Sequence, residues 1–298
     1  MKVLSFLPLL LRQLCLSRTS LPLTLVKATA LDLAILAGRV LIYPYGLAQE
    51  RRSAESRPGP QADHDTEHGT AHDTAPAGTT ALPADTPDRP PVILLHGFID
   101  NRSVFVLLRR SLARHGWRHL ESLNYSPLTC DVRTAAELLS RHVEEICTRT
   151  GHQRIDIVGH SLGGLIARYY VQRLGGDLRV RTLVTLGTPH SGTAAAPLAS
   201  AHPIVRQMRS GSDLIEELRR PAPGCRTRFV SFWSELDRVM LPVESACIEH
   251  PDLETQNVRV TGIGHLALPV HPAVAAGIRQ ALESDDAGIT GSGAASVA

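Results

Sequence analysis

The sequence predicts an α/β protein built on a mostly parallel, doubly wound sheet. Three observations predict this fold class. Short apolar runs alternate with segments of helical periodicity between residues 91 and 283. A hydrophobic fraction of 43% in 298 residues is enough to fill the core of one large α/β domain. A glycine-rich turn at 159–164 joins an apolar run to a helical pattern, and such strand–helix alternation is typical of parallel sheets, whose strands need crossover connections.

The predicted elements follow one another in a regular order. Apolar runs predict strands at 92–95, 117–123, 154–158, 180–186, 227–233 and 257–261. Helical patterns predict helices at 103–114, 131–149, 162–174, 212–220 and 271–282. In the helix at 131–149, Asp131 is the expected N-cap, and apolar residues recur every three or four positions. Together these elements predict one domain over residues 91–283.

Residues 1–50 form an apolar N-terminal segment that charged residues interrupt. Lys27, Asp32 and Arg39 lie within its longest apolar stretch, so no run of about 18 uncharged apolar residues occurs. Asp32 alone would cost about 2.5–3.5 kcal/mol at the centre of a membrane span. Two interpretations stay open. The segment serves export or lies at a membrane interface, or it is a helix packed on the main domain.

The other two flanking segments are polar. Residues 51–90 are rich in Pro, Ala, Thr, Asp, His and Gly and hold one large apolar side chain, Leu82. Such a segment buries too little surface to offset its ordering entropy, so we expect a disordered linker. Residues 284–298 are small and polar, and we expect a flexible tail.

The strongest chemical signal is Gly159-His160-Ser161-Leu162-Gly163, which fits the pattern G-x-S-x-G. A predicted strand precedes it and a predicted helix follows it, as a nucleophile elbow requires. The sharp turn holds the serine hydroxyl clear of the backbone, and the glycines leave room for the helix to approach the sheet. The sequence therefore predicts Ser161 as a catalytic nucleophile.

A serine hydroxyl is a weak nucleophile and needs a base, which an acidic side chain orients. After a nucleophile elbow of this kind, the acid and then the histidine follow along the chain. His265 lies in a glycine-containing loop after the predicted strand 257–261, so it is the expected base. Asp237, after the strand 227–233, is the expected acid, with Glu235 as the alternative.

When a serine of this kind attacks a carbonyl group, the tetrahedral intermediate needs an oxyanion hole. One donor is expected to be the backbone N–H of Leu162, at the start of the helix after the nucleophile. The other is expected in the loop after the first strand, which reads His96-Gly97-Phe98. We predict the backbone N–H of Phe98 as that donor, with His96 and Gly97 forming a supporting turn.

Four stretches resemble bacterial lipases and esterases of the α/β-hydrolase superfamily. They are VILLHGF at 92–98, GHSLGG at 159–164, TLGTPHSGT at 185–193, and Gly264-His265. The third is similar to triacylglycerol lipases in particular. The resemblance implies hydrolysis of carboxylic esters by a triad of Ser161, Asp237 and His265, and lipid or acylglycerol esters are the expected substrates.

The same resemblance implies roles for neighbouring residues. His190 is expected to shape the site wall, and His160 to support the nucleophile. The segment 191–225 is expected to form a short cap, which acts as a lid or as the wall of the acyl pocket. No metal site and no cofactor are expected.

Composition narrows the classes of partner. The net charge of +2 gives no general attraction to nucleic acid. The expected partners are an ester or lipid substrate, from the resemblance, and a membrane surface that would bind residues 1–50. A membrane-associated or secreted location is favoured over a cytoplasmic one. The five cysteines form no C-x-x-C pair, and whether Cys225 and Cys247 form a disulfide stays open.

Two other functions remain open at this point. An acyltransferase would use the same triad with an alcohol or amine acceptor, and a non-catalytic protein of this fold would only bind a ligand. Because the first ninety residues lack every catalytic motif, we also expect a chain that starts near Asp88 to hydrolyse a soluble ester about as fast as the whole chain.

Overall fold

The structure is a computed structural model that describes residues 23–38, 89–98, 100, 102–123, 131–196, 202–284 and 295–297. The predicted linker lies outside the described residues except for its last two positions. Residues 1–22 and 39–50 of the N-terminal segment and most of the predicted tail also lie outside them.

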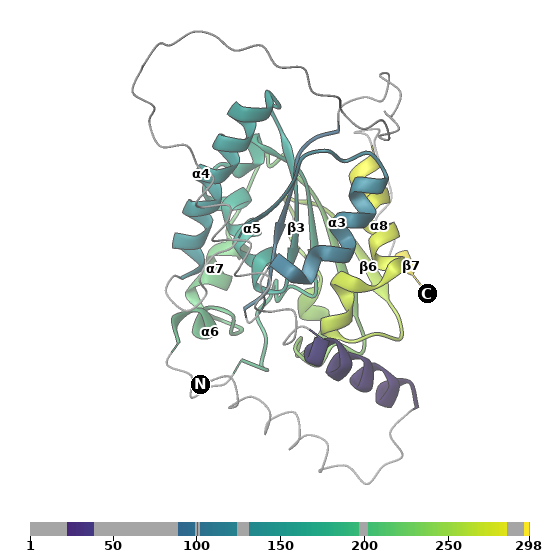
Figure 1. The fold of residues 1–298 in the computed structure, drawn as a ribbon. Helices are drawn as coiled ribbons and strands as arrows, with labels where there is room; N and C mark the ends of the chain where they lie inside the picture. The colour runs from purple at the N-terminus through teal and green to yellow at the C-terminus, as the bar shows by residue number, and fades with distance from the viewer. Residues whose placement is uncertain are drawn as a thin grey trace, which may run out of the picture.

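One parallel sheet forms the centre of the molecule (Figure 1). In the described residues it has seven strands in the order β2-β1-β3-β4-β5-β6-β7, and every neighbouring pair is parallel. The strands are β1 (Val92–Leu95), β2 (Leu120–Leu123), β3 (Ile155–His160), β4 (Val180–Leu186), β5 (Arg228–Ser234), β6 (Glu254–Val260) and β7 (Ala295–Val297). The predicted mostly parallel, doubly wound sheet is confirmed. Strand β7 falls within the predicted tail and pairs with Val258–Val260 of β6.

Helices cover both faces of the sheet and divide the core into two layers. Helices α4 (Val132–Thr150) and α5 (Leu162–Arg173) pack on one face. Helices α3 (Val106–Arg114) and α8 (Pro272–Glu283) pack on the other (Figure 1). Because both faces are covered, the central strands carry mostly apolar side chains, and β1 is apolar and buried along its whole length.

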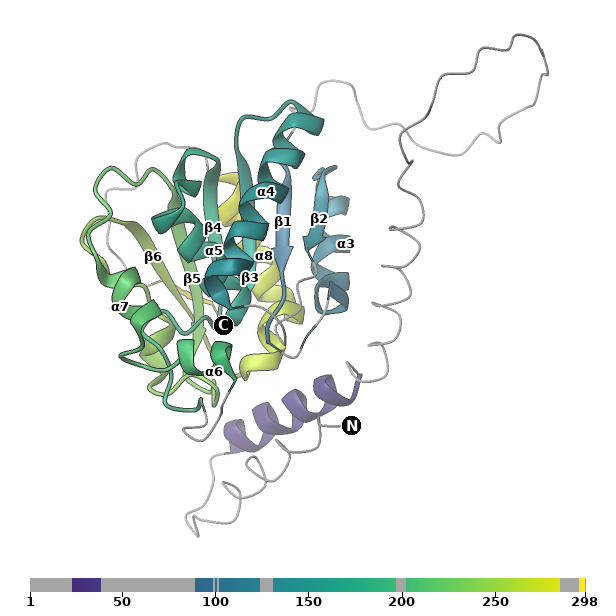
Figure 2. The same cartoon turned by 90° about the vertical axis from the view of Figure 1, so that its left-hand side faces the viewer.

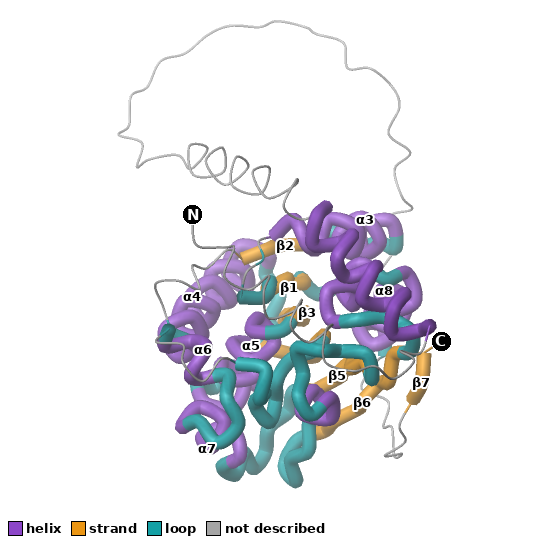
Figure 3. Tube along the Cα trace, turned by 90° about the horizontal axis from the view of Figure 1, so that it is seen from below, coloured by secondary structure: helices purple, strands orange, loops and turns teal. Residues whose placement is uncertain are grey.

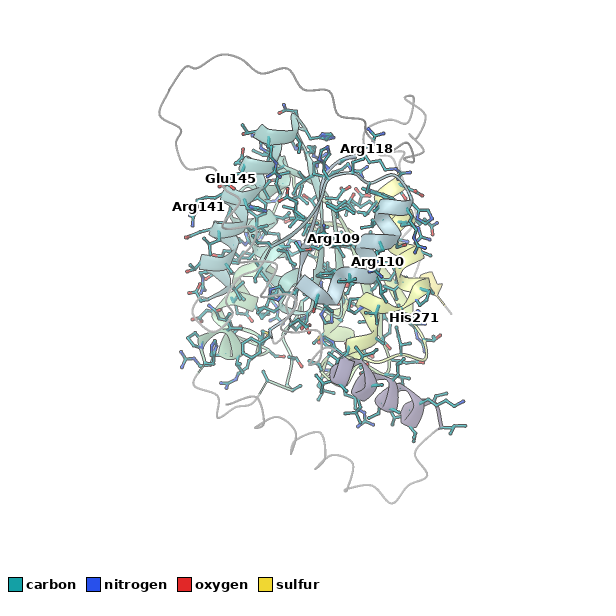
Figure 4. The ribbon with its side chains drawn as sticks, in the orientation of Figure 1. Arg109, Arg110, Arg118, Arg141, Glu145 and His271 are labelled. Atoms are coloured by element: carbon teal, nitrogen blue, oxygen red, sulfur yellow. The ribbon has the colours of Figure 1, made fainter. Side chains whose placement is uncertain are left out.

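Helix α4 shows how the sequence sets an element. The side chain of Asp131 accepts a hydrogen bond from the Thr134 N–H at 2.8 Å, as an N-cap does. The helix ends at Gly151, whose left-handed φ of 75° closes it. Arg141 and Glu145 project from the side of α4 that faces away from the sheet (Figure 4).

Two strands begin three residues away from their predicted starts. Residues 117–119 precede β2 rather than belonging to it, and the Trp117 ring is buried beneath the guanidinium of Arg89, 4.0 Å from the ring centroid. Strand β6 starts at Glu254 rather than at 257. Its first residues are polar and partly exposed because the strand lies near the sheet edge, where an apolar run is not required.

The carboxyl ends of the strands meet at one edge, which lies at the bottom of Figure 1 and faces the viewer in Figure 3. The chain leaves β1 for β2 on one side and then returns to β3 on the other side. The crevice between β1 and β3 is therefore a topological switch point, where α/β sheets bind ligands. The short elements η2 (Arg102–Phe105), η3 (Gly176–Leu178), η4 (Val243–Ala246), η5 (His265–Val270), α6 (Pro203–Gln207) and α7 (Asp213–Arg219) complete the domain.

A further helix, residues 23–38, lies across this carboxyl edge beside η5 (Figure 2). Its residues Leu25, Ala28, Asp32 and Ile35 share one face, at the three- and four-residue spacing of a helix, and face the domain. Of the two interpretations of this segment, packing on the domain is therefore observed for residues 23–38. Among the described helices, none is long and apolar enough to cross a membrane.

Candidate active site

Ser161 sits at the sharp turn between β3 and α5. Its backbone angles, φ 53° and ψ −119°, are unusual for a residue other than glycine. A backbone conformation of this kind costs about 1–3 kcal/mol. Backbone bonds hold it, because its N–H donates to the Leu186 carbonyl at 2.9 Å. Its own carbonyl accepts from the Gly164 N–H at 3.1 Å and from the Thr188 hydroxyl at 3.0 Å. The turn is thus fixed before any substrate arrives.

Gly163 lets α5 begin directly against the end of β1. A Cβ at this position would lie 2.3 Å from the carbonyl oxygen of Leu95, a backbone atom that cannot move away. The absence of a side chain at 163 therefore brings the N-terminus of α5 next to the loop after β1. Leu162, the first residue of α5, therefore lies at the end of β1, and the first N–H groups of a helix have no partner within the helix.

Phe98, the expected source of the second oxyanion donor, lies in the loop after β1. Its ring meets that of His202 edge-on, with centroids 5.4 Å apart. Gly97, just before it, adjoins the nucleophile, because a Cβ there would lie 3.3 Å from the Ser161 Cβ. His96 is buried, and its Nδ1 lies 2.9 Å from the Gly97 carbonyl. The structure therefore brings this loop and Ser161 together.

His265 and Asp237 form a buried pair. His265 Nδ1 lies 2.7 Å from Asp237 Oδ2. The other carboxylate oxygen, Oδ1, accepts from the N–H groups of Val239 at 2.8 Å and Met240 at 3.0 Å. The carboxylate is thus held by its own loop, and it fixes the imidazole with Nε2 left for another partner.

The surroundings of His265 act on its charge in opposite directions. Burial disfavours the imidazolium and lowers the pKa, while the carboxylates of Asp237, Asp32 and Asp100 favour it. The carboxylates prevail, so the pKa of His265 is raised above its ordinary value. The surrounding carboxylates therefore stabilise the imidazolium form of His265.

The alternative acid, Glu235, points elsewhere. Its carboxylate pairs with the Arg259 guanidinium at the surface. Of the two carboxylates after β5, only Asp237 contacts His265 in the described residues. Asp252 accepts the Ala222 N–H at 2.7 Å.

His160 contacts His265 on one side and Asp100 on the other. The His160 ring centroid lies 4.8 Å from that of His265, and its Nε2 lies 3.3 Å from the His265 carbonyl oxygen. On its other side, Nδ1 lies 3.3 Å from Asp100 Oδ2. Since His160 directly precedes Ser161, this contact brings the Ser161 turn next to the His265 loop. No sequence signal singled out Asp100.

His190 occupies a supporting place. Its Nε2 lies 3.0 Å from the Thr185 hydroxyl, which donates to Ser231 at 3.0 Å. Burial and the charge of Arg168 hold the pKa of His190 well below its usual range, so the ring is neutral. It belongs to a buried hydroxyl chain between β4 and β5 and stabilises the turn after β4.

Gly187 is a further residue to which the sequence assigned no role of its own. It has a left-handed φ of 53°. A Cβ there would lie 2.9 Å from both Asp237 Oδ2 and His265 Nδ1. Glycine is therefore required at the point where the turn after β4 meets the hydrogen bond of the acid–base pair. The stretch TLGTPHSGT carried the signal, but only the fold shows what this glycine adjoins.

The expected cap, 191–225, is docked on the domain over its described part. Helices α6 and α7 bury Ile204, Leu214, Ile215 and Leu218 in the same core cluster as α4 and α5. Arg133 and Glu217 pair across α4 and α7 at 2.6 Å. These contacts fit a fixed pocket wall better than a hinged lid.

In the described residues, no group of three His, Cys, Asp or Glu side chains could hold a metal ion.

Cys225 and Cys247 are free thiols, and burial raises the pKa of Cys247 to about 11. The disulfide that the sequence left open is therefore not formed in the structure.

Comparison with known proteins adds to this geometry. The palmitoyl protein thioesterase family matches residues 91–221. A triacylglycerol lipase of Burkholderia plantarii is 31% identical over 137 residues, which are 43% of this chain and 38% of that lipase. Another, of Pseudarthrobacter phenanthrenivorans, is 30% identical over 115 residues, or 36% of this chain and 35% of that lipase. This chain therefore matches little more than a third of the length of either relative.

Solved structures show the same fold. The crystal structure of a Bacillus licheniformis lipase in mature form aligns with a TM-score of 0.56 at 15% identity, over 67% of this chain and 96% of that one. The likenesses confirm the predicted α/β-hydrolase fold and the resemblance to lipases and esterases. The family match covers Ser161 and stops before Asp237 and His265.

Proposed function

We propose that this chain, which has the α/β-hydrolase fold and resembles lipases, is a serine hydrolase that cleaves carboxylic esters through an acyl-enzyme on Ser161. The observation that carries this proposal is the buried His265–Asp237 pair. The imidazole of His265 lies 4.8 Å, centroid to centroid, from that of His160, the residue that directly precedes the strained Ser161. A strained nucleophile, an oriented base and a helix N-terminus in one crevice are the parts that acyl transfer needs.

The reaction proceeds in two halves. His265 Nε2 takes the proton of the Ser161 hydroxyl while the oxygen attacks the ester carbonyl, and the N–H groups of Leu162 and Phe98 bind the oxyanion. The intermediate collapses as the imidazolium gives its proton to the leaving alcohol. Water then loses a proton to His265 and attacks the acyl-enzyme, and the carboxylic acid leaves as Ser161 regains its proton.

Ester substrates with a lipid acyl chain fit the comparisons best. The names of two relatives concern triacylglycerol, and the matching family is named for a palmitoyl thioester. Oxygen esters and thioesters both pass through an acyl-serine, so the triad serves either. Turnover of a series of acylglycerols against acyl-thioesters of the same chain length distinguishes the two substrates.

Labelling with a fluorophosphonate tests the mechanism directly. The wild-type chain should bind the probe covalently, and Ser161→Ala should lose the label together with ester hydrolysis, by about 10⁴-fold or more. A folded wild-type protein that takes no label would favour the non-catalytic alternative. Adding a competing alcohol and measuring ester formation separates hydrolysis from acyl transfer.

Helix 23–38 also supports a membrane-surface role, with a membrane-associated or secreted location. The side opposite the domain carries the exposed residues Leu23, Val26, Ala30, Leu33 and Ala37 at alternating spacings of three and four. Exposed Lys27 beside this stripe suits an anionic lipid surface. Replacing Val26 and Leu33 by Glu should abolish co-sedimentation with anionic vesicles and spare hydrolysis of a soluble ester. Unchanged sedimentation would exclude this surface.

A further inference from the structure

The docked face of helix 23–38 reaches the loop that carries His265. Asp32 Oδ1 accepts a hydrogen bond from the Ala267 N–H at 3.2 Å, across 235 residues of sequence. The other carboxylate oxygen lies against Gly264, since a Cβ there would come within 2.0 Å of it. Asp32 therefore touches the chain on both sides of the expected base.

The rest of the same face holds the helix in this place. Ala28 is only 2% exposed, and Ile35 packs against the core cluster of α3 and α8. Leu25 lines a pocket of about 330 Å³ together with Leu236, Asp237 and Leu241 of the loop after β5. The helix thus faces the Asp237 loop across this pocket through Leu25 and contacts the His265 loop through Asp32.

We infer that Asp32 is a positioning residue for catalysis, which fixes the His265 loop from outside the 91–283 domain. The inference rests on the proposed function, because it assigns His265 as the base. A charged residue inside an apolar helix is costly to keep, and its contact with Ala267 and Gly264 supplies the physical reason for it.

The charge of Asp32 also acts on His265. The ionisable groups that face this imidazole are Asp237, Asp32 and Asp100, with His160 alongside, and each carboxylate raises the pKa of His265. Removing the Asp32 charge should therefore lower the pKa of His265. Since the base must be neutral, the acid limb of kcat/KM should then move to lower pH.

Two substitutions separate the contact from the charge. Asp32→Asn keeps an oxygen that can accept the Ala267 N–H but removes the charge, so the acid limb should shift to lower pH with kcat largely kept. Asp32→Ala removes both, and kcat for a soluble ester should fall about 10-fold with KM little changed.

Asp252→Asn is the matched control, because Asp252 also accepts a loop N–H, that of Ala222, but does not touch His265. It should leave the pH profile unchanged. Gly264→Ala tests the packing, since the new methyl group would displace the Asp32 carboxylate, while the backbone at φ −95° and ψ −172° accepts alanine. It should impair the wild type and add little to Asp32→Ala.

An NMR titration of His265 in a Ser161→Ala background separates this inference from the proposed function, because it needs no activity. The pKa of His265 should be lower with Asp32→Asn than without it. An unchanged pKa together with unchanged kcat in Asp32→Ala would overturn the positioning role. An inactive wild type with the shifted pKa would instead overturn the proposed function and leave the contact established.

Discussion

At the scale of single residues, the site depends on groups whose positions are fixed from several sides. Asp237 accepts two N–H groups of its own loop while it holds His265. His265 is held in turn through its ring by Asp237 and through its carbonyl by His160. This arrangement gives the imidazole one orientation before substrate binds, so the reaction needs little reorganisation.

The raised pKa of His265 predicts the pH dependence of activity. The base works only when neutral, so kcat/KM should rise with pH and reach half its maximum above the ordinary histidine value of about 6.5. Asp237→Asn removes the nearest carboxylate, and it should lower kcat by about 10⁴-fold. A half-maximum below pH 6 in the wild type would contradict the electrostatic account.

Gly187→Ala should separate the acid from the base. Its Cβ would meet Asp237 Oδ2 and His265 Nδ1 at 2.9 Å in a backbone conformation that already disfavours alanine. We expect loss of ester hydrolysis by at least 100-fold. Gly175→Ala is the matched control, because Gly175 has a φ of +72° with nothing within 4 Å, so it should cost about 1 kcal/mol of stability and no activity.

At the scale of elements, a buried arginine joins the nucleophile helix to the pocket wall. Arg168 of α5 donates to the carbonyls of His190 at 3.1 Å and Leu218 at 3.2 Å, and its Nε bonds Gln172 at 2.7 Å. Burial lowers the pKa of Arg168 to about 9, which still leaves it charged at neutral pH. One side chain thus ties α7 and the turn after β4 to α5.

Arg168→Met should weaken this junction, because the buried His190 carbonyl would lose its guanidinium donor and the Leu218 carbonyl would keep only the Gln172 Nε2 donor at 3.4 Å. We expect the free energy of unfolding to fall by about 3 kcal/mol, measured by urea denaturation. Arg219→Met, on the exposed side of α7 in a pair with Glu216, should change it by less than about 0.5 kcal/mol. Equal effects of the two substitutions would show that the Arg168 contacts add nothing to stability.

At the scale of the whole molecule, helix 23–38 is the part of the N-terminal segment that packs on the domain. It lies over the carboxyl edge of the sheet, with an inner face against the active-site loops and an outer face of apolar side chains, of which Leu23 is 67% exposed (Figure 2). These contacts argue against our expectation from sequence that a chain starting near Asp88 would keep full activity.

Deleting residues 1–38 should therefore impair catalysis as well as membrane binding. We expect kcat on a soluble short-chain ester to fall about 10-fold, with a lower melting temperature, because Ala28, Asp32 and Ile35 no longer cover the domain. The measurements are initial rates and thermal unfolding of both chains. Full activity of the shortened chain at unchanged stability would restore the original expectation.

The sequence by itself determined the fold class and the order along the chain of the candidate nucleophile, acid and base. Apolar runs and helical spacing predicted the parallel sheet, because strands covered on both faces are mostly apolar. The elbow at 159–163 marked Ser161, because few sequences satisfy a strand, a G-x-S-x-G turn and a helix in succession. Local patterns of this kind need no knowledge of distant contacts.

The tertiary structure alone decided which distant groups meet. Glu235 and Asp237 are two residues apart, and only the course of the loop turns Asp237 inward and Glu235 toward Arg259. In the sequence, Asp32 only interrupts an apolar segment. Its partner Ala267 lies 235 positions away, so no local pattern connects the two residues. Packing brings such residues together through contacts between elements, and no local periodicity records those contacts.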